Sequence, residues 1–96
     1  MRLREEERIA LKKALKDFKG EIYLFGSRIN PKKKGGDIDI LLIPEEDISP
    51  LKLELEVKRR FFEECEEDID VVIYRKGDPF CEEILKNAKR ITLEEL

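Results

Sequence analysis

The sequence predicts one small α/β domain, built from a short β-sheet with helices packed against it. Three apolar runs rich in strand-forming residues lie at 21–25, 37–43 and 68–74, and such runs are typical of strands. Segments with helical apolar spacing or helix-capping residues lie before, between and after these runs. The 96 residues suffice for a single core, so we expect one domain over residues 1–96 and no separate substrate domain.

The N-terminal part is expected to hold one helix and two strands joined by a loop. The helix is expected over residues 2–18, and Gly20 follows as a stop signal. The run "EIYLF" predicts the first strand, and "DIDILLI" predicts the second. Between them, residues 26–36 contain Asn-Pro and Gly-Gly pairs, which are typical of loops. The N-terminal helix is predicted from apolar residues that recur every three or four positions, namely Leu11, Ala14, Leu15 and Phe18.

Residues 49–66 carry two conflicting patterns. "LKLELEVK" alternates apolar and charged residues, which is the pattern of a strand. Ser49-Pro50 is instead a helix cap followed by proline at the first helical position, and Leu, Lys, Glu and Arg are strong helix formers. Periodicity alone leaves residues 51–57 open between helix and strand. We expect a helix because the residues that follow them do not alternate.

The C-terminal third is expected to hold a strand and a helix. The run "DIDVVIY" predicts the third strand, and Asp78-Pro79 repeats the cap-plus-proline start of a helix. The last residues, "ITLEEL", suit either a frayed turn or a short strand. The helix would carry an apolar stripe formed by Phe80, Cys81, Ile84, Leu85 and Ala88.

Charged residues make up 45% of the chain, yet 23 acidic and 20 basic residues leave a net charge of only −3. This balance argues against a general nucleic-acid binder, which needs a basic excess or a basic face. The abundance of Glu, Lys and Arg is associated with proteins of hot environments, so we expect a thermophilic source. No stretch suits a membrane span and the charged N-terminus does not resemble a signal peptide, so we expect a cytoplasmic protein with no membrane partner.

The two cysteines, Cys65 and Cys81, are too few for a disulfide scaffold. The chain has no histidine, so an ordinary zinc site cannot be assembled around them. We expect both to be small thiols that are buried or half-buried.

Two aspartates open the second predicted strand, where this residue type is uncommon. Residues i and i+2 of a strand face the same way, about 6.6 Å apart at roughly 3.3 Å per residue. Asp37 and Asp39 can therefore converge on magnesium, which takes oxygen ligands and is usually held by one or two carboxylates plus substrate phosphates. Asp68 and Asp70 repeat the spacing. If the two strands are neighbours, we expect Asp70 to be the third ligand, because an apolar run follows it, whereas Asp68 ends an acidic run.

A phosphate-binding segment is expected just before these aspartates. Gly26 lets the backbone approach a phosphate, and the amides that follow can receive its oxygens. Ser27 adds a hydroxyl donor, and Arg28 with the lysines at 32–34 supplies positive charge. The spacing is not that of a Walker loop.

Each of these signals has an ordinary structural explanation when it stands alone. Gly-Ser pairs occur in turns, and aspartates serve as caps and turn residues. A run of lysines is commonly a solvated loop. Their order and spacing, together with a further aspartate on the third strand, favour a nucleotide site over these explanations.

The stretch "GSRINPKKKGGDIDILLI" resembles the signature of the nucleotidyltransferase superfamily related to DNA polymerase β. With "DIDVVIY" and "DPFCEEILKNAKRI" downstream, the chain is similar to the smallest members, the minimal nucleotidyltransferases, over about residues 5–91. The resemblance implies a small mixed β-sheet flanked by helices, like the palm of polymerase β. It also implies a helix over residues 49–66.

The resemblance also implies roles for individual residues. The glycine-serine pair would hold nucleotide phosphate, and the Asp-x-Asp pair would hold the metal. The third carboxylate would help to deprotonate the acceptor. The implied residues are Gly26, Ser27, Arg28 and Gly36 for nucleotide binding, and Asp37, Asp39 and Asp70 for catalysis and metal binding.

The implied reaction transfers AMP, or another nucleoside monophosphate, from ATP to an acceptor hydroxyl with release of pyrophosphate. Two magnesium ions would bind with the nucleotide. Minimal nucleotidyltransferases are commonly paired with a small helical HEPN-domain protein, and some are antitoxins that adenylylate a tyrosine of that partner. The resemblance therefore implies a HEPN-type partner and an antitoxin role. The acceptor, the base preference and the oligomeric state stay open.

Two other functions are compatible with the sequence. The protein could be a non-catalytic module that neutralises or scaffolds a partner by contact, with a relic nucleotide pocket, although the intact aspartates argue against a relic. It could also adenylylate a small molecule alone, which the absence of room for an acceptor domain disfavours.

Overall fold

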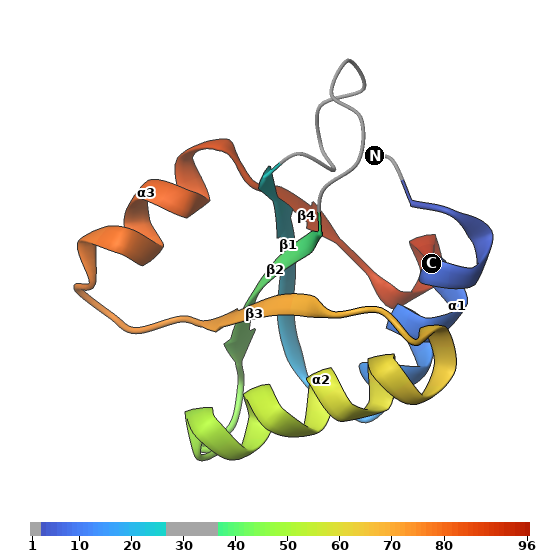
Figure 1. Ribbon diagram of the computed structural model, residues 1–96. Helices are drawn as coiled ribbons and strands as arrows, with labels where there is room; N and C mark the ends of the chain where they lie inside the picture. Colours follow the sequence, from blue (N-terminus) through green and yellow to red (C-terminus); the bar gives the residue numbers. More distant parts are fainter. Residues whose placement is uncertain (1–2, 27–36) are drawn as a thin grey trace.

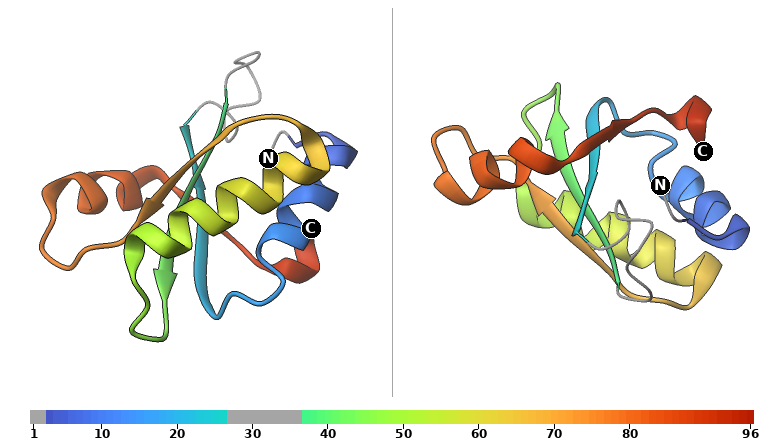
Figure 2. Two further views of the ribbon diagram at one scale, coloured as in Figure 1. Left: turned by 60° about the horizontal axis from the view of Figure 1, so that its bottom comes forward. Right: turned by 90° about the horizontal axis from the view of Figure 1, so that it is seen from above.

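Strand-forming runs build a four-stranded mixed sheet in the part of the chain that the computed structural model describes, residues 3–26 and 37–96 (Figure 1). Seen from above, α3 lies on one side of β1 and β2 and α1 lies on the other (Figure 2, right). The predicted α/β class is therefore confirmed. The elements, in chain order, are α1 (Glu5–Ala14), β1 (Gly20–Phe25), β2 (Ile38–Pro44), α2 (Pro50–Cys65), β3 (Ile69–Ile73), α3 (Pro79–Asn87), β4 (Lys89–Ile91) and the 3₁₀-helix η2 (Leu93–Glu95).

The sheet has the strand order β3-β2-β1-β4. β1 pairs antiparallel with both β2 and β4, whereas β2 pairs parallel with β3. Parallel neighbours need a long crossover connection, and α2 supplies it between β2 and β3. This topology brings the starts of β2 and β3 to the same end of the sheet, and β1 ends there too, with Phe25 opposite Asp39.

The core lies between one face of the sheet and the helices α1 and α2. Alternate residues of the strands point into it, and Phe61 of α2 is its largest fully buried side chain. Burying such side chains is the main favourable term in folding. The buried residues of the core are Ala10, Leu11, Ala14, Leu15, Ile22, Leu24, Ile38, Ile40, Leu42, Val57, Phe61, Ile69, Val71 and Ile91.

The two cap-plus-proline signals begin helices where the sequence predicts them. Ser49 precedes α2, and its Oγ accepts a hydrogen bond from the backbone N–H of Lys52 at 3.5 Å. Asp78 precedes α3, and its Oδ1 accepts from the N–H of Phe80 at 2.9 Å. The helix over 51–57 is thus confirmed, because capping and helix propensity prevail over the short alternating pattern.

The first helix is shorter than predicted. α1 ends at Ala14, and a turn follows in which the N–H of Phe18 donates to the carbonyl of Leu15 at 3.0 Å. Leu15 is nevertheless buried. A turn after a helix can place apolar residues three or four positions apart, as a helix does. The spacing of Leu15 and Phe18 therefore led to a predicted C-terminal end of the helix that lies beyond Ala14.

The apolar stripe predicted for α3 is not buried along its whole length, since the side chain of Phe80 is 60% exposed. Cys81, the next residue, is buried. Successive residues of a helix point about 100° apart, so Phe80 is turned away from the side that Cys81 occupies.

Three smaller predictions also have an outcome. Cys65 is half-buried and Cys81 buried, and both are free thiols, as expected. The C-terminal segment contains both alternatives in turn, since β4 ends at Ile91 and η2 follows. Among the described residues, no helix combines the length and the apolar character needed to cross a membrane.

Candidate active site

Asp39 of β2 and Asp70 of β3 are register partners on neighbouring parallel strands. Side chains alternate between the two faces of a strand, and paired residues share a face. Ile38 and Ile40 point into the core, so Asp39 points away from α1 and α2, and Asp70 points the same way. Neighbouring strands lie about 4.8 Å apart, so the two aspartates start from adjacent backbone positions. The strands are therefore adjacent, as the assignment of Asp70 required.

Asp37 extends this acidic group beyond the start of β2. It lies two residues before Asp39, at an exposed position, while Asp39 is half-buried and Asp70 is exposed. Asp68 is exposed and lies before β3 begins, so Asp70 is the one level with Asp39. The structure brings Asp39 and Asp70 to one end and one face of the sheet, with Asp37 just before β2 at the same end, and the catalytic roles of all three stay a prediction.

Gly26 closes β1 directly against Asp39. Its φ of +78° is a conformation that L-residues with a side chain rarely adopt. A Cβ at this position would lie 2.3 Å from Oδ2 of Asp39 and 3.2 Å from its Cγ. Both the backbone conformation and the space therefore require glycine here, and the main chain of Gly26 borders the carboxylate.

The other predicted nucleotide-binding residues lie outside the described part of the chain. Ser27, Arg28 and Gly36 fall in the segment 27–36, as do the lysines at 32–34. Their contacts with a phosphate stay predictions.

The donor set fits magnesium in chemistry and in backbone placement. Asp39 and Asp70 on adjacent strands, with Asp37 just before β2, supply the oxygen ligands that this ion takes. Within residues 3–26 and 37–96, however, no three acidic or thiol side chains are gathered closely enough to hold a metal ion.

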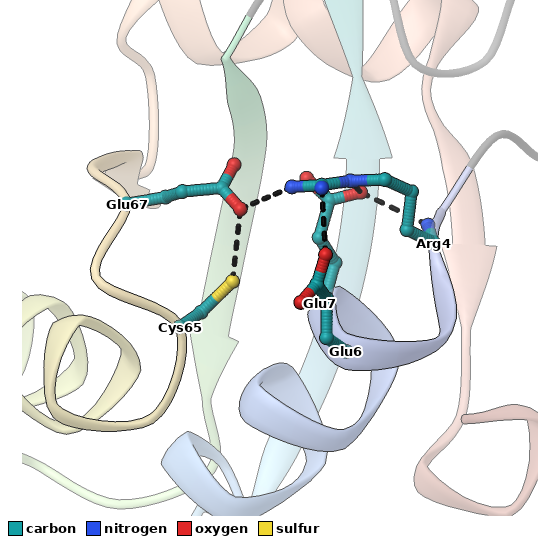
Figure 3. A network of polar contacts seen from close by, with 5 residues as sticks. All are labelled: Arg4, Glu6, Glu7, Cys65 and Glu67. Carbon is teal, nitrogen blue, oxygen red and sulfur yellow. Dashed lines mark hydrogen bonds and ion pairs between the residues drawn. The ribbon is translucent and has the colours of Figure 1, made fainter.

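Sequence reasoning missed a polar network beside the same end of the sheet. Glu7 of α1 is fully buried and lies against Arg4, which also contacts Glu67 before β3 (Figure 3). The only sequence signal was the Arg-x-x-Glu spacing at the start of a helix. It is weak, because arginine is not among the preferred residues at an N-cap.

Three solved structures similar to this chain contain toxin–antitoxin complexes. A mutant of the MntA–HpeT toxin–antitoxin gives a TM-score of 0.68 and 24% identity over 95% of this chain and 73% of that chain. A toxin–antitoxin with AMP-PNP gives 0.66 and 24% over 91% and 72%. A tri-AMPylated Shewanella oneidensis HEPN toxin in complex with MNT antitoxin gives 0.63 and 22% over 93% and 73%. These likenesses show a shared fold.

No curated protein matches the chain. The family model described as "Polymerase beta, Nucleotidyltransferase" matches residues 6–95, nearly the whole chain. The match spans both aspartate-bearing strands and the glycine between β1 and the loop. The chain therefore belongs to the polymerase β nucleotidyltransferase family.

Proposed function

We propose that this protein transfers AMP from ATP to a hydroxyl group of a partner protein and requires magnesium to do so. The observation that carries the proposal is the pairing of Asp39 with Asp70 in register on one face of the sheet. Asp37 lies two residues away, and Gly26 packs against Asp39. Membership of the nucleotidyltransferase family supports the reaction type.

In the transfer itself, the acceptor oxygen forms a bond to the α-phosphorus of ATP. The bond between that phosphorus and the bridging oxygen to the β-phosphate breaks, and pyrophosphate leaves. Bound magnesium would stabilise the negative charge on the reacting phosphates and polarise the attacking oxygen. Asp37 and Asp39 would hold the metal. Asp70 would orient the acceptor hydroxyl and take up its proton.

The leaving phosphates would lie at the end of β1. Gly26, with its left-handed φ of +78°, borders the carboxylate of Asp39 there, so the backbone that enters the predicted phosphate-binding segment starts beside the proposed metal ligand. Ser27, Arg28 and Gly36 would complete this cradle. Positioning and charge stabilisation would supply most of the rate enhancement, as in other phosphoryl transfers.

The acceptor is proposed to be a HEPN-type protein, and the role that of an antitoxin in the cytoplasm. One structure of similar fold contains a tri-AMPylated HEPN toxin in complex with an MNT antitoxin. Another is a toxin–antitoxin with the ATP analogue AMP-PNP. The first supports a protein as the acceptor of AMP, and the second supports ATP as the donor.

The test uses ATP labelled at the α-phosphate, magnesium, and lysate of the source organism. The intact protein should label a second protein, and the Asp37→Asn/Asp39→Asn variant should not. Equal labelling by both forms, or label on a small molecule alone, would contradict the proposal. The labelled band would identify the partner.

A second candidate is a binding module that neutralises its partner by contact. It is favoured by the observation that no three acidic side chains of the described segments are gathered as a metal site. The exposed apolar side chains Leu51, Leu55 and Phe62 of α2 would suit a protein contact. In the labelling experiment this candidate predicts no transfer, with a partner that co-purifies equally with both forms.

A further inference from the structure

Glu7 is a buried carboxylate in an otherwise apolar group of buried residues. Its side chain is fully buried in the first turn of α1. Acidic side chains are almost never fully buried unless they are paired. Here Oε1 accepts a hydrogen bond from the backbone N–H of Arg4 at 2.9 Å and lies 3.5 Å from Nε of the same residue.

Arg4 connects Glu7 to two further glutamates, Glu6 in α1 and Glu67 before β3. Its Nη1 donates to Glu6 at 2.6 Å, and its Nη2 donates to Oε2 of Glu67 (Figure 3). The hydrogen bond with Glu7, together with the charges of the neighbouring glutamates, raises the pKa of Arg4. One planar guanidinium thus links the start of α1 to the segment between α2 and β3, a geometry that lysine does not reproduce.

Glu67 is held from the other side by Cys65, the last residue of α2. The thiol donates to the same Oε2 at 3.0 Å. Burial, and then this hydrogen bond, raises the pKa of Cys65 to about 12, so the thiol stays a donor at neutral pH. Glu66 between them adopts a left-handed φ of 54°. The turn that leads into β3 is therefore fixed at several points.

Glu67 lies three residues before Asp70. The position of that segment along the sheet decides which residue of β3 stands level with Asp39, and a slip of one residue would turn Asp70 to the opposite face. We propose that Arg4 is a positioning residue, which through Glu67 holds Asp70 level with Asp39. This inference rests on the proposed function, since the role of Asp70 does.

The second ion pair between α1 and this part of the chain provides a matched control. Lys13 contacts Glu64 at 3.1 Å, with side chains 58% and 39% exposed, against 57% and 36% for Arg4 and Glu67. Both pairs join α1 to the end of α2 or the turn after it. Only the Arg4–Glu67 pair acts on the segment that enters β3.

The test compares Glu67→Ala with Glu64→Ala in the full-length protein. Three properties are measured: hydrogen exchange at Ile69–Val71, the affinity for manganese(II) alone, and AMP transfer. Groups that support a metal ligand typically change metal affinity or activity by about tenfold or more when they are removed. We therefore expect Glu67→Ala to weaken manganese binding and transfer by about tenfold and to speed exchange, with Glu64→Ala like the unaltered protein.

A double variant tests whether Arg4 acts through Glu67. If it does, Arg4→Ala/Glu67→Ala should bind manganese no more weakly than Arg4→Ala. Fully additive losses would contradict the inference, as would equal exchange and manganese affinity in Glu67→Ala and Glu64→Ala. Failure of the proposed function looks different: Asp39→Asn would then transfer as well as the unaltered protein. Exchange and manganese binding decide the role of Arg4 even then.

Discussion

Replacing Gly26 by alanine should damage catalysis far more than stability. A Cβ at Gly26 would lie 2.3 Å from Oδ2 of Asp39, and Cβ contacts under 3.0 Å essentially do not occur, so the carboxylate must move by about 0.7 Å or more. The oxygen is the end of a side chain, so this movement costs little folding energy. A misplacement of about 1 Å at a reacting centre can cost roughly a hundredfold in rate.

Gly77→Ala is the matched control. Gly77 has a φ of +82°, nearly that of Gly26, but an added Cβ would meet nothing within 4 Å. Placing an L-residue in the left-handed region costs about 1–2 kcal/mol, and in a domain of this size each kcal/mol lowers Tm by about 4–8 °C. Both variants should therefore lose similar stability.

The assay is AMP transfer from α-labelled ATP, measured well below the Tm of both variants, together with thermal unfolding. We expect Gly77→Ala to transfer like the unaltered protein and Gly26→Ala to be about a hundredfold slower. Equal transfer rates in the two variants would refute the argument that Gly26 is required by its contact with Asp39.

Three further predictions concern stability. The pKa of Cys65 is raised, chiefly by burial, from the ordinary 9.0 to about 12, and a raised thiol pKa contributes stability that is lost as pH rises over that range. Cys65→Ser, which keeps a donor to Glu67, should therefore lose less unfolding free energy over the same pH range. An unchanged pH dependence would contradict the raised pKa of this buried thiol. Asp78→Ala should cost about 1 kcal/mol in urea unfolding by removing the α3 cap, without changing transfer; no loss would show that the cap contributes little. Phe61→Ala should cost about 3–5 kcal/mol, enough to unfold much of the protein at 37 °C by circular dichroism; a near-native Tm would contradict its place in the core.

Local chemistry made much of the fold predictable. Ser49-Pro50 and Asp78-Pro79 begin helices for reasons contained within a few residues, namely a side-chain acceptor and a fixed φ. Boundaries and orientations were harder. The end of α1 and the exposure of Phe80 depend on what the rest of the chain places next to them.

The candidate site was predictable in its residue types but not in its register. The spacing of Asp37 and Asp39 indicated a shared direction, whereas the pairing of Asp39 with Asp70 depends on β2 and β3 being parallel neighbours. The role proposed for Arg4 depends on contacts between residues 63 positions apart in the sequence. No periodicity or motif reports such a contact.

The most direct test of the central claim, that Asp70 acts level with Asp39, compares Asp70→Asn with Asp68→Asn in AMP transfer. Both aspartates are exposed and two residues apart, but only Asp70 is the register partner of Asp39. Each change removes one negative charge from an exposed position, so we expect both variants to remain folded. We expect Asp70→Asn to lose AMP transfer and Asp68→Asn to keep it; transfer that survives in Asp70→Asn, or is lost equally in both variants, would contradict a role for Asp70 level with Asp39.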